Sequence, residues 1–400
     1  MRVTQSLNQS QFLSAIETLQ SNLSQTQNQI SSNLSFTTAS QNPTAAGAVD
    51  NYNQALAQSQ QYDTNANSAQ TRLSTEDSTL SQVQTQLQSL RDLALEANNS
   101  SLSNEDRTAI AAQATQIQNS LLALANTQDG NGEYLFGGFS TQTQPFTLSA
   151  GGATYNGDQG QRQVQIAAGQ TVADSDSGDA VFGQIKTGNG TFTATAASTN
   201  TGTAVLGATT VSNAGAYAAG NGLYSINFTA PGTYEVRDST NALVSSGTYT
   251  DGGTISFAGI QVTLTGQPAA GDSVAVAPSS NQSLFTTVQN LVTALKSGVS
   301  TSAQTAQLNN AIGTSINNLD QALNQTSNVR ASIGGRLNSI TTQQSVSGSQ
   351  QIQLQSNISS LQSLDYAGAI TTLDQQNTTL SAALQAFSLT QGLSLFKYIQ

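Results

Sequence analysis

Cysteine, histidine and tryptophan are all absent from this 400-residue chain. Without thiols or imidazoles, the chain cannot build a disulfide, a Cys-His or Ser-His-Asp nucleophile, or a zinc site of the usual kind. The absence of cysteine also leaves no thiol to be trapped if the chain crosses from the cytosol to the exterior. We therefore expect a protein that is not an enzyme and that needs no cofactor.

Charged residues are also scarce, at 8% of the chain, and hydrophobic residues reach only 36%. Both fractions are low for a globular protein, and uncharged polar residues make up nearly half of the sequence. The net charge of −11 repels phosphate backbones and anionic bilayers. Because of this charge we expect no nucleic-acid partner, and since no run approaches about 18 apolar residues, we expect no membrane insertion. Because the opening residues lack an apolar run and a small-residue cleavage site, we expect no cleaved secretory signal.

The apolar spacing predicts long helices toward both ends of the chain. A first helix is expected over roughly residues 4–36, and a second one from 52 to 97 keeps alternating spacings of three and four without a slip. At 1.5 Å per residue, the second would be roughly 70 Å long. Ser103 is placed to cap a third helix, which Asp129 and Gly130 end. Helical periodicity returns at about residue 283 and continues to Phe387.

The middle of the chain, about residues 132–282, is rich in glycine and has an apolar period of two, which predicts antiparallel strands. Pro231-Gly232 and residues 251–253 supply turns, and Gly259 shifts the alternation as a bulge would. The fold class is therefore α+β: a long antiparallel α-helical coiled coil or bundle built from both termini, with an inserted antiparallel β domain. Because the insertion needs neighbouring entry and exit points, the flanking helices should lie side by side.

The expected organisation has three parts. Residues 1–42 and 364–400 form terminal helical assembly segments. Residues 43–185 and 283–363 form a helical rod domain with a β-hairpin at about 132–183, and residues 186–282 form the inserted β domain.

The apolar stripes of the two terminal segments are weak and almost uncharged. They therefore contribute to the stability of the fold only when they are paired. We infer that residues 1–40 and 365–400 are mobile in the monomer and become ordered on pairing with each other and with neighbouring copies. The alternative is a monomeric bundle whose stripes are already satisfied. The candidate interface residues are Ile16, Leu19, Leu23, Ile30, Tyr366, Ile370, Leu373, Leu380, Leu384, Phe387, Leu393, Leu395, Phe396 and Tyr398.

Three local motifs have competing interpretations. Residues 134–136 form either a partner-binding patch or, as we favour, a hairpin packed on the helices. Residues 174–179 resemble the start of a calcium loop, but Ile185 stands where a bidentate Glu is required, so we expect a solvated turn. Residues 330–336, with two glycines between arginines, interrupt a helical stripe and indicate either a local bend or a contact with another subunit.

Several segments together resemble the bacterial flagellin family and, within it, the subgroup that joins hook to filament. The matching segments are residues 1–4, 29–33, 41–45, 134–139, 145–146, 155–158, 365–367 and 392–398. The resemblance covers residues 1–185 and 283–400. It departs from the family at Asn33, where the family has glycine, and at Gln41-Asn42, where it has an acidic pair.

The resemblance implies an extracellular structural subunit without an active site, exported through the flagellar channel with no cleaved signal. It implies a homo-oligomeric ring or helical layer, with another hook-associated protein on the hook side, flagellin on the filament side and an export chaperone as partners. Terminal helices would line the inner tube, and residues 186–282 would face outward. The alternatives are a flagellin that forms the filament itself and, from another class, a surface adhesin that binds through residues 186–282.

Overall fold

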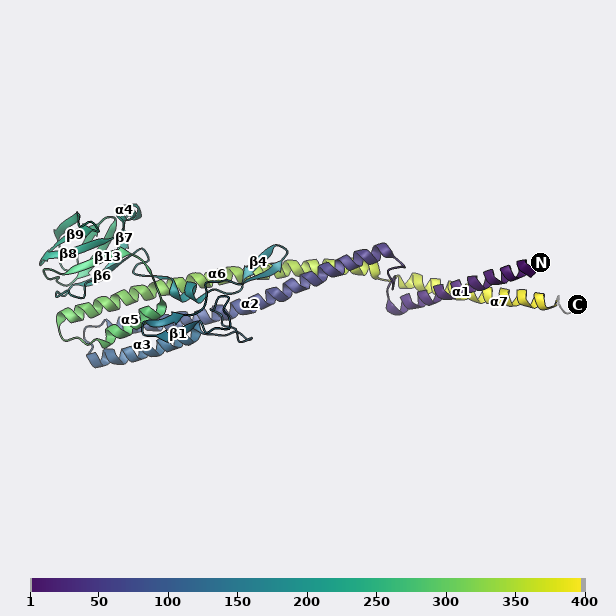
Figure 1. Ribbon diagram of the computed structural model, residues 1–400, viewed down its shortest axis with the longest axis horizontal. Coiled ribbons are helices and arrows are strands. Elements are labelled where there is room, and N and C mark those ends of the chain that lie inside the picture. Colours follow the sequence, from purple (N-terminus) through teal and green to yellow (C-terminus); the bar gives the residue numbers. More distant parts are fainter. Residues whose placement is uncertain (1, 397–400) are drawn as a thin grey trace. The chain divides into compact units, whose positions relative to one another are not determined.

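The structure is a computed structural model that describes residues 2–396, with side chains described for residues 6–390. The chain divides into two compact units, one formed by residues 1–64 with 343–400 and the other by residues 65–342. Two long helices, α2 (Pro43–Ala97) and α6 (Ser302–Gln362), contribute to both units (Figure 1). Each unit is described below by itself.

The first unit pairs the two ends of the chain. Helix α1 (Arg2–Ser32) packs along α7 (Tyr366–Phe396), which confirms the prediction that both termini share one bundle. A small apolar cluster lies where α2 begins and α6 ends; its members are Phe36, Ala45, Ala46 and Val49, with Ile358 and Leu361 packed against them.

The link that follows α1 explains one departure from the family pattern. Asn33 has a φ of 57°, in the left-handed region that glycine enters most easily and asparagine tolerates better than most residues. The chain then bonds to the C-terminal end of α6, because the Ser35 N–H donates to the Gln362 carbonyl at 2.7 Å. Asn33 therefore adopts a backbone conformation that glycine would also adopt without strain.

The start of α2 explains the other departure. Asn42 caps the helix, since its Oδ1 accepts a hydrogen bond from the Ala45 N–H at 3.1 Å. Pro43 occupies the first helical position, where its missing N–H costs nothing. The Gln41 side chain accepts from the Thr37 N–H at 2.6 Å. The amide of Asn42 thus caps the helix, and the amide of Gln41 binds the turn that precedes it.

In the second unit, the predicted stripe of α2 is buried without interruption. Its members, each at most 1% exposed, are Ala66, Ala69, Leu73, Glu76, Leu80, Val83, Leu87, Leu90, Ala94 and Ala97. Helices α3 (Asn104–Ala125) and α5 (Leu284–Lys296) pack on each other beside this stripe and α6. The predicted cap of α3 is confirmed, because Ser103 and Asp106 form a reciprocal capping box. Helix α2 starts nine residues earlier than its expected start at 52.

The middle of the chain is antiparallel throughout, as predicted. Two hairpins, β1–β2 and β3–β4, precede a short β5–β14 ladder and two larger sheets in the orders β10-β9-β8-β13-β6 and β11-β12-β7. The strands are β1 (Phe146–Ser149), β2 (Gly152–Tyr155), β3 (Gln163–Ala167), β4 (Gln170–Ala173), β5 (Ile185–Lys186), β6 (Phe192–Ala196), β7 (Val205–Val211), β8 (Tyr224–Ala230), β9 (Thr233–Asp238), β10 (Leu243–Thr248), β11 (Thr254–Phe257), β12 (Ile260–Thr265), β13 (Ser273–Pro278) and β14 (Asn281–Gln282).

Two features of this region differ from expectation. Gly259 makes a turn and not a bulge: Phe257 pairs with Ile260, and Ala258 and Gly259 both have positive φ, at 44° and 79°, as a two-residue hairpin turn requires. The region also holds a short helix, α4 (Ala214–Ala219), and a π-helical turn, η1 (Asp179–Gly183). Their apolar residues are too few to show a helical period.

The two larger sheets enclose their own apolar core and are attached to α6 by side-chain amides. Asn310 on α6 accepts from the Leu206 N–H at 2.7 Å and donates to the Ala204 carbonyl at 3.1 Å. Asn318 accepts from the Gly188 N–H at 2.8 Å. Buried backbone groups of the insertion are therefore satisfied by the helix on which it lies.

Candidate functional site

The paired terminal helices bring together several of the candidate interface residues. Ile16 is buried, and the ring of Phe12 lies 6.3 Å from the ring of Phe387 on α7, centroid to centroid. Ala369, which the heptad frame did not include, is also buried. The candidates that are half-buried are Leu19, Leu23, Ile30, Leu373, Leu380 and Phe387. These residues make a seam that a single chain can form.

Other candidates remain exposed on the same helices. Tyr366, Ile370 and Leu384 are 53%, 40% and 45% exposed, and Leu389, which the pattern missed, is 69% exposed. On α1, Leu7 and Leu13 are 57% and 46% exposed. A helix with apolar side chains on several sides is normally covered on several sides, whereas these apolar side chains are left uncovered when α1 and α7 pair. The candidates Leu393, Leu395, Phe396 and Tyr398 lie outside the described side chains.

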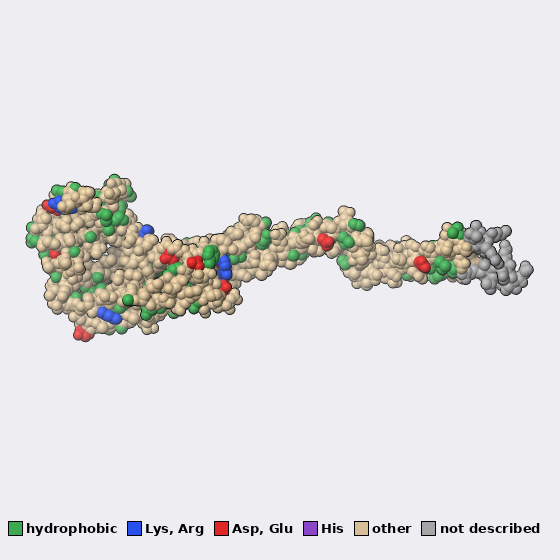
Figure 2. Space-filling view, in the orientation of Figure 1, with side chains coloured by type: hydrophobic (Ala, Val, Ile, Leu, Met, Phe, Trp, Pro, Cys, Tyr) green, Lys and Arg blue, Asp and Glu red, His purple; other side chains and the backbone are tan. Residues whose placement is uncertain are grey.

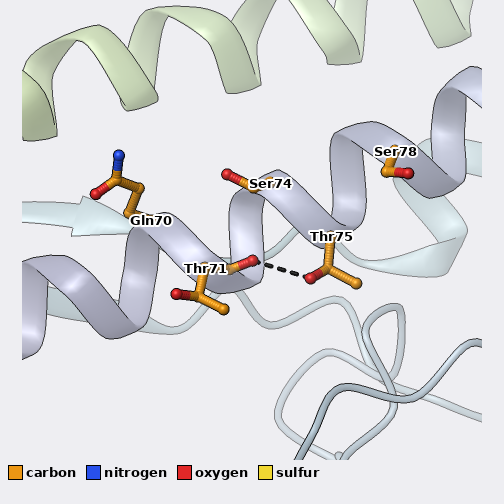
Figure 3. A pocket seen from close by; sticks show the side chains of 5 residues that line it. All are labelled: Gln70, Thr71, Ser74, Thr75 and Ser78. Atoms are coloured by element: carbon orange, nitrogen blue, oxygen red, sulfur yellow. Dashed lines mark hydrogen bonds between the residues drawn. The ribbon is translucent and has the colours of Figure 1, made fainter.

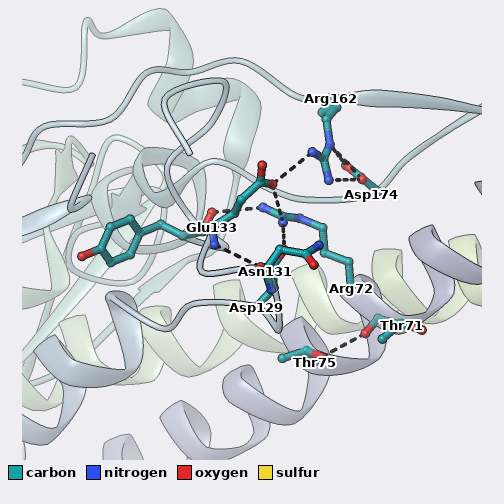
Figure 4. A network of polar contacts seen from close by, with 9 residues as sticks. Thr71, Arg72, Thr75, Asp129, Asn131, Glu133, Arg162 and Asp174 are labelled. Atoms are coloured by element: carbon teal, nitrogen blue, oxygen red, sulfur yellow. Dashed lines mark hydrogen bonds and ion pairs between the residues drawn. The ribbon is translucent and has the colours of Figure 1, made fainter. Parts of the chain in front are cut away.

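Charged side chains, which are rare in this chain, lie together in a polar network of the second unit (Figure 4). Arg72 on α2 lies 2.5 Å from Asp129 and 3.4 Å from Glu133, measured from its Nη1 to their carboxylate oxygens. Arg162 lies 3.2 Å from Glu133 and 2.7 Å from Asp174. The network therefore joins the long helix to the segments around the β3–β4 hairpin.

The expectation of a solvated turn at residues 174–179 is wrong. Asp174 is 2% exposed and Ser175 1% exposed. Asp176 forms an ion pair with Arg336 on α6 and donates its backbone N–H to the Oε1 atom of Glu76 at 3.2 Å. Asp174 and Asp176 therefore form ion pairs with arginines and are not solvated. The spacing of the acidic residues alone does not distinguish this role from that of a surface turn.

Glu76 is the most deeply buried carboxyl group of this cluster, at 0% exposed. Burial raises its pKa well above the ordinary value, and the neighbouring charge of Asp176 raises it further, against the opposing effect of Arg336. Its Oε2 atom has no hydrogen-bond partner among the described residues. Glu76 thus occupies an apolar position of the α2 stripe at a cost in stability.

The other local predictions are decided by packing. Leu135 and Phe136 are fully buried in the core of the second unit, which confirms that the segment packs on the helices; it forms turns with one bridge, between Gln128 and Tyr134, and not a hairpin. The segment 330–336 remains helical within α6, and its arginines bind inside the chain: the Arg330 guanidinium lies 2.8 Å from Asp77 on α2. A bend in α6 is therefore not required to explain why residues 330–336 interrupt the apolar stripe of this helix.

A shallow groove along α2 is lined by uncharged polar side chains (Figure 3). Its lining residues carry hydroxyl and amide groups only: Gln70, Thr71, Ser74, Thr75 and Ser78. The Thr75 hydroxyl donates to the Thr71 carbonyl at 2.9 Å. No lining residue can act as a general acid or base near neutral pH.

Within residues 2–396, no cluster of three or more acidic, histidine or cysteine side chains is placed to hold a metal ion. Across the same described part of the chain, no helix combines the length and apolar character needed to cross a bilayer.

The fold and the open terminal pair define an axial protein of the flagellin type: a chain whose two ends pair and whose middle carries an inserted β domain. The N-terminal part, residues 3–141, matches the family model of the bacterial flagellin N-terminal helical region. Residues 195–278 match a D2-like domain of flagellar hook-associated protein 1. The insertion, which the sequence resemblance did not cover, therefore also has a flagellar counterpart.

Three relatives specify the family. Flagellar hook-associated protein 3 of Salmonella typhimurium is 32% identical over 185 residues, which is 46% of this chain and 58% of that protein, so the match spans just over half of that curated relative. A crystal structure of Xanthomonas campestris FlgL is 40% identical, covers 77% of this chain and 99% of its own, and has a TM-score of 0.69. The flagellar junction protein FlgL of Legionella pneumophila is 32% identical, with coverages of 74% and 99% and a TM-score of 0.68.

The chain belongs to the flagellar hook-associated protein 3 (FlgL) family. This membership makes it a structural protein of the flagellar hook–filament junction. The alternative of a flagellin that forms the filament is less supported, because the relatives above are hook-associated proteins.

Proposed function

We propose that this chain joins hook to filament by axial assembly, in which the α1–α7 pair of each copy packs against the pairs of its neighbours. The observation that carries the proposal is the set of exposed apolar side chains on that pair, which includes Leu7, Leu13, Ile370, Leu384 and Leu389. Fully burying a large apolar side chain contributes about 1.5–3 kcal/mol, so each of these half-exposed residues would add roughly 1 kcal/mol on assembly.

The scarcity of charge supports the same mode of assembly. Of the described side chains on α1 and α7, only Glu17 and Asp374 are ionisable acids, and none is basic. Subunits stacked closely through these helices would therefore bury few charges, whose desolvation opposes association. Low charge with moderate apolar content suits a contact among many copies.

The remaining parts of the proposal concern partners and location. We place another hook-associated protein on the hook side, flagellin on the filament side, and an export chaperone before assembly. The protein works outside the cell, after export through the flagellar channel without a cleaved signal, and it acts as a mechanical adaptor and not as an enzyme. The domain assignment goes with this role: residues 1–42 and 364–400 assemble, and residues 186–282 face outward.

The test removes the C-terminal half of the terminal pair. Cells whose own copy lacks residues 366–400 should secrete flagellin into the medium and carry hooks without filaments. A matched control removes residues 192–278 and joins Thr191 to Ser279, whose backbone groups already bond at 2.9 Å. That variant keeps α1 and α7 and should retain filaments. Attached, rotating filaments on cells with the first deletion would contradict the proposal.

A further inference from the structure

The second unit presents one aromatic ring to solvent. Phe139 is 66% exposed, although it directly follows a segment whose Leu135 and Phe136 are fully buried. The sequence pattern did not separate it from those neighbours. An exposed aromatic side chain is common at the centre of protein–protein contacts, because it buries a large area at a small cost in side-chain entropy.

The loop that carries Phe139 is held rigidly by one carboxylate. Asp158 Oδ1 accepts from the Phe139 N–H at 2.9 Å and from the Gly160 N–H at 2.7 Å, while Oδ2 accepts from the Ser140 hydroxyl at 2.8 Å. The bond from the Phe139 N–H is the main reason why the pKa of Asp158 lies below its ordinary value. The backbone at Phe139 is therefore ordered without any partner.

Two glycines make this arrangement possible. Gly138 has a φ of 71°, and a Cβ there would lie 2.4 Å from the Asp158 carbonyl oxygen. A Cβ on Gly160 would lie 2.1 Å from the ring of Phe139, so the ring rests against this glycine while most of its surface stays open. A ring fixed before binding loses little freedom when a partner covers it.

The surroundings of the ring indicate the partner. None of residues 134–157 is charged, and the same stretch carries a second exposed apolar side chain, Leu148, at 64%. Each copy has a net charge of −11, so two copies approach most favourably where neither contributes charge. A basic partner would instead be drawn to acidic groups, but this stretch has none, and the Asp158 carboxylate that follows it is engaged by three donors. Charged side chains are sparse on the face that the space-filling view shows (Figure 2).

We propose that Phe139 is the anchor of a contact between two copies of this chain, made by the second unit in addition to the terminal helices. The contact rests on the proposed function, because it forms only where copies are assembled side by side. In this proposal the rigid 137–140 loop helps to hold neighbouring subunits of one layer together.

The experiment uses the full-length chain in assembled flagella. Since the chain has no cysteine, Gln142→Cys places one thiol on the exposed stretch beyond the loop, to which a benzophenone is attached. On irradiation we expect a covalent dimer of this chain. Adding Phe139→Ser should lower the dimer yield at least fivefold, and Asp158→Asn, which keeps the ring but weakens its clamp, should lower it less. Leu243→Ser, at a 55% exposed site on β10, is the control and should leave the yield unchanged.

Three results would overturn the inference: no dimer, an adduct with a different protein, or a dimer yield that Phe139→Ser does not lower. Unchanged thermal unfolding of Phe139→Ser checks that the variant folds, as its exposure predicts. If filaments remain attached while the dimer is missing, the Phe139 contact fails and the proposed junction role stands. If wild-type flagella do not contain the chain at all, the proposed function itself fails.

Discussion

Glu76→Gln should stabilise the second unit, and the gain should grow with pH. Glu76 is fully buried in the α2 stripe beside Asp176, and the ionised carboxylate has a single hydrogen bond, from the Asp176 N–H. Glutamine has nearly the same shape and keeps an oxygen to accept that bond. It removes the charge whose burial opposes folding.

The magnitude follows from proton linkage. The folded-state pKa of Glu76 is raised above its unfolded value, so its favourable contribution is complete below the unfolded pKa and is lost as pH rises toward the folded pKa. Between those two values, the wild type loses about 1.4 kcal/mol of unfolding free energy per pH unit relative to Glu76→Gln. Above the folded pKa the difference stays constant.

Urea unfolding from pH 4 to pH 9, followed by circular dichroism, measures this difference directly. Glu96→Gln is the matched control, because Glu96 lies on the same helix with an exposed side chain. We expect the curves of wild type and Glu76→Gln to diverge as pH rises, while Glu96→Gln runs parallel to the wild type. Parallel curves for all three proteins would refute the burial argument.

Other predictions concern packing, caps and the exposed loop. Leu90→Ala, at a fully buried site of α2, should lower the unfolding free energy by about 2–5 kcal/mol, whereas Leu95→Ala, 47% exposed on the same helix, should change it far less; chemical denaturation compares them. Asn33→Val should cost roughly 1–2 kcal/mol, because its φ of 57° is unfavourable for a branched side chain, and Asn33→Gly should restore stability; melting of the first unit checks both. Ser103→Ala should cost about 1 kcal/mol through the lost cap of α3, and an unchanged urea midpoint would contradict this. Asp158 has a lowered pKa, so its clamp should be complete above the unfolded pKa and lost as pH falls through the folded one; a lower protection factor of the Phe139 amide in acid, taken relative to the intrinsic exchange rate at each pH, would show this, and a protection factor that does not change with pH would contradict it.

The helical part of the fold was predictable because its signal is periodic and long. Leu73, Leu80 and Leu87 recur in one unbroken frame, and each is fully buried in the structure. The cap at Ser103 was predictable for a related reason, since capping depends on residues only three positions apart. Such local rules do not need the tertiary structure.

The features that were missed depend on contacts between distant segments. Residues 174–179 looked like a solvated turn, but Asp174 meets Arg162, and Asp176 meets Arg336 from the far end of the sequence. Phe139 looked like its buried neighbour Phe136, and only the path of the loop separates them. The bulge at Gly259 was wrong because its phase shift equally fits a two-residue turn.

The candidate interface was only partly readable from the sequence. The seam between α1 and α7 follows from the heptad frame, and Ile16 is buried as that frame requires. Which apolar residues stay exposed after pairing does not follow from it, because α7 carries apolar side chains on several sides. Leu389 was missed for this reason.

The central claim is that the α1–α7 pair is completed only by neighbouring copies. Hydrogen exchange of the dilute full-length chain and of the chain in assembled flagella, followed by mass spectrometry, tests this claim most directly. We predict rapid exchange in α1 and α7 of the isolated chain, slow exchange at buried positions of residues 65–342, and strong protection of α1 and α7 after assembly. Equal protection of the terminal helices in both samples would contradict the account.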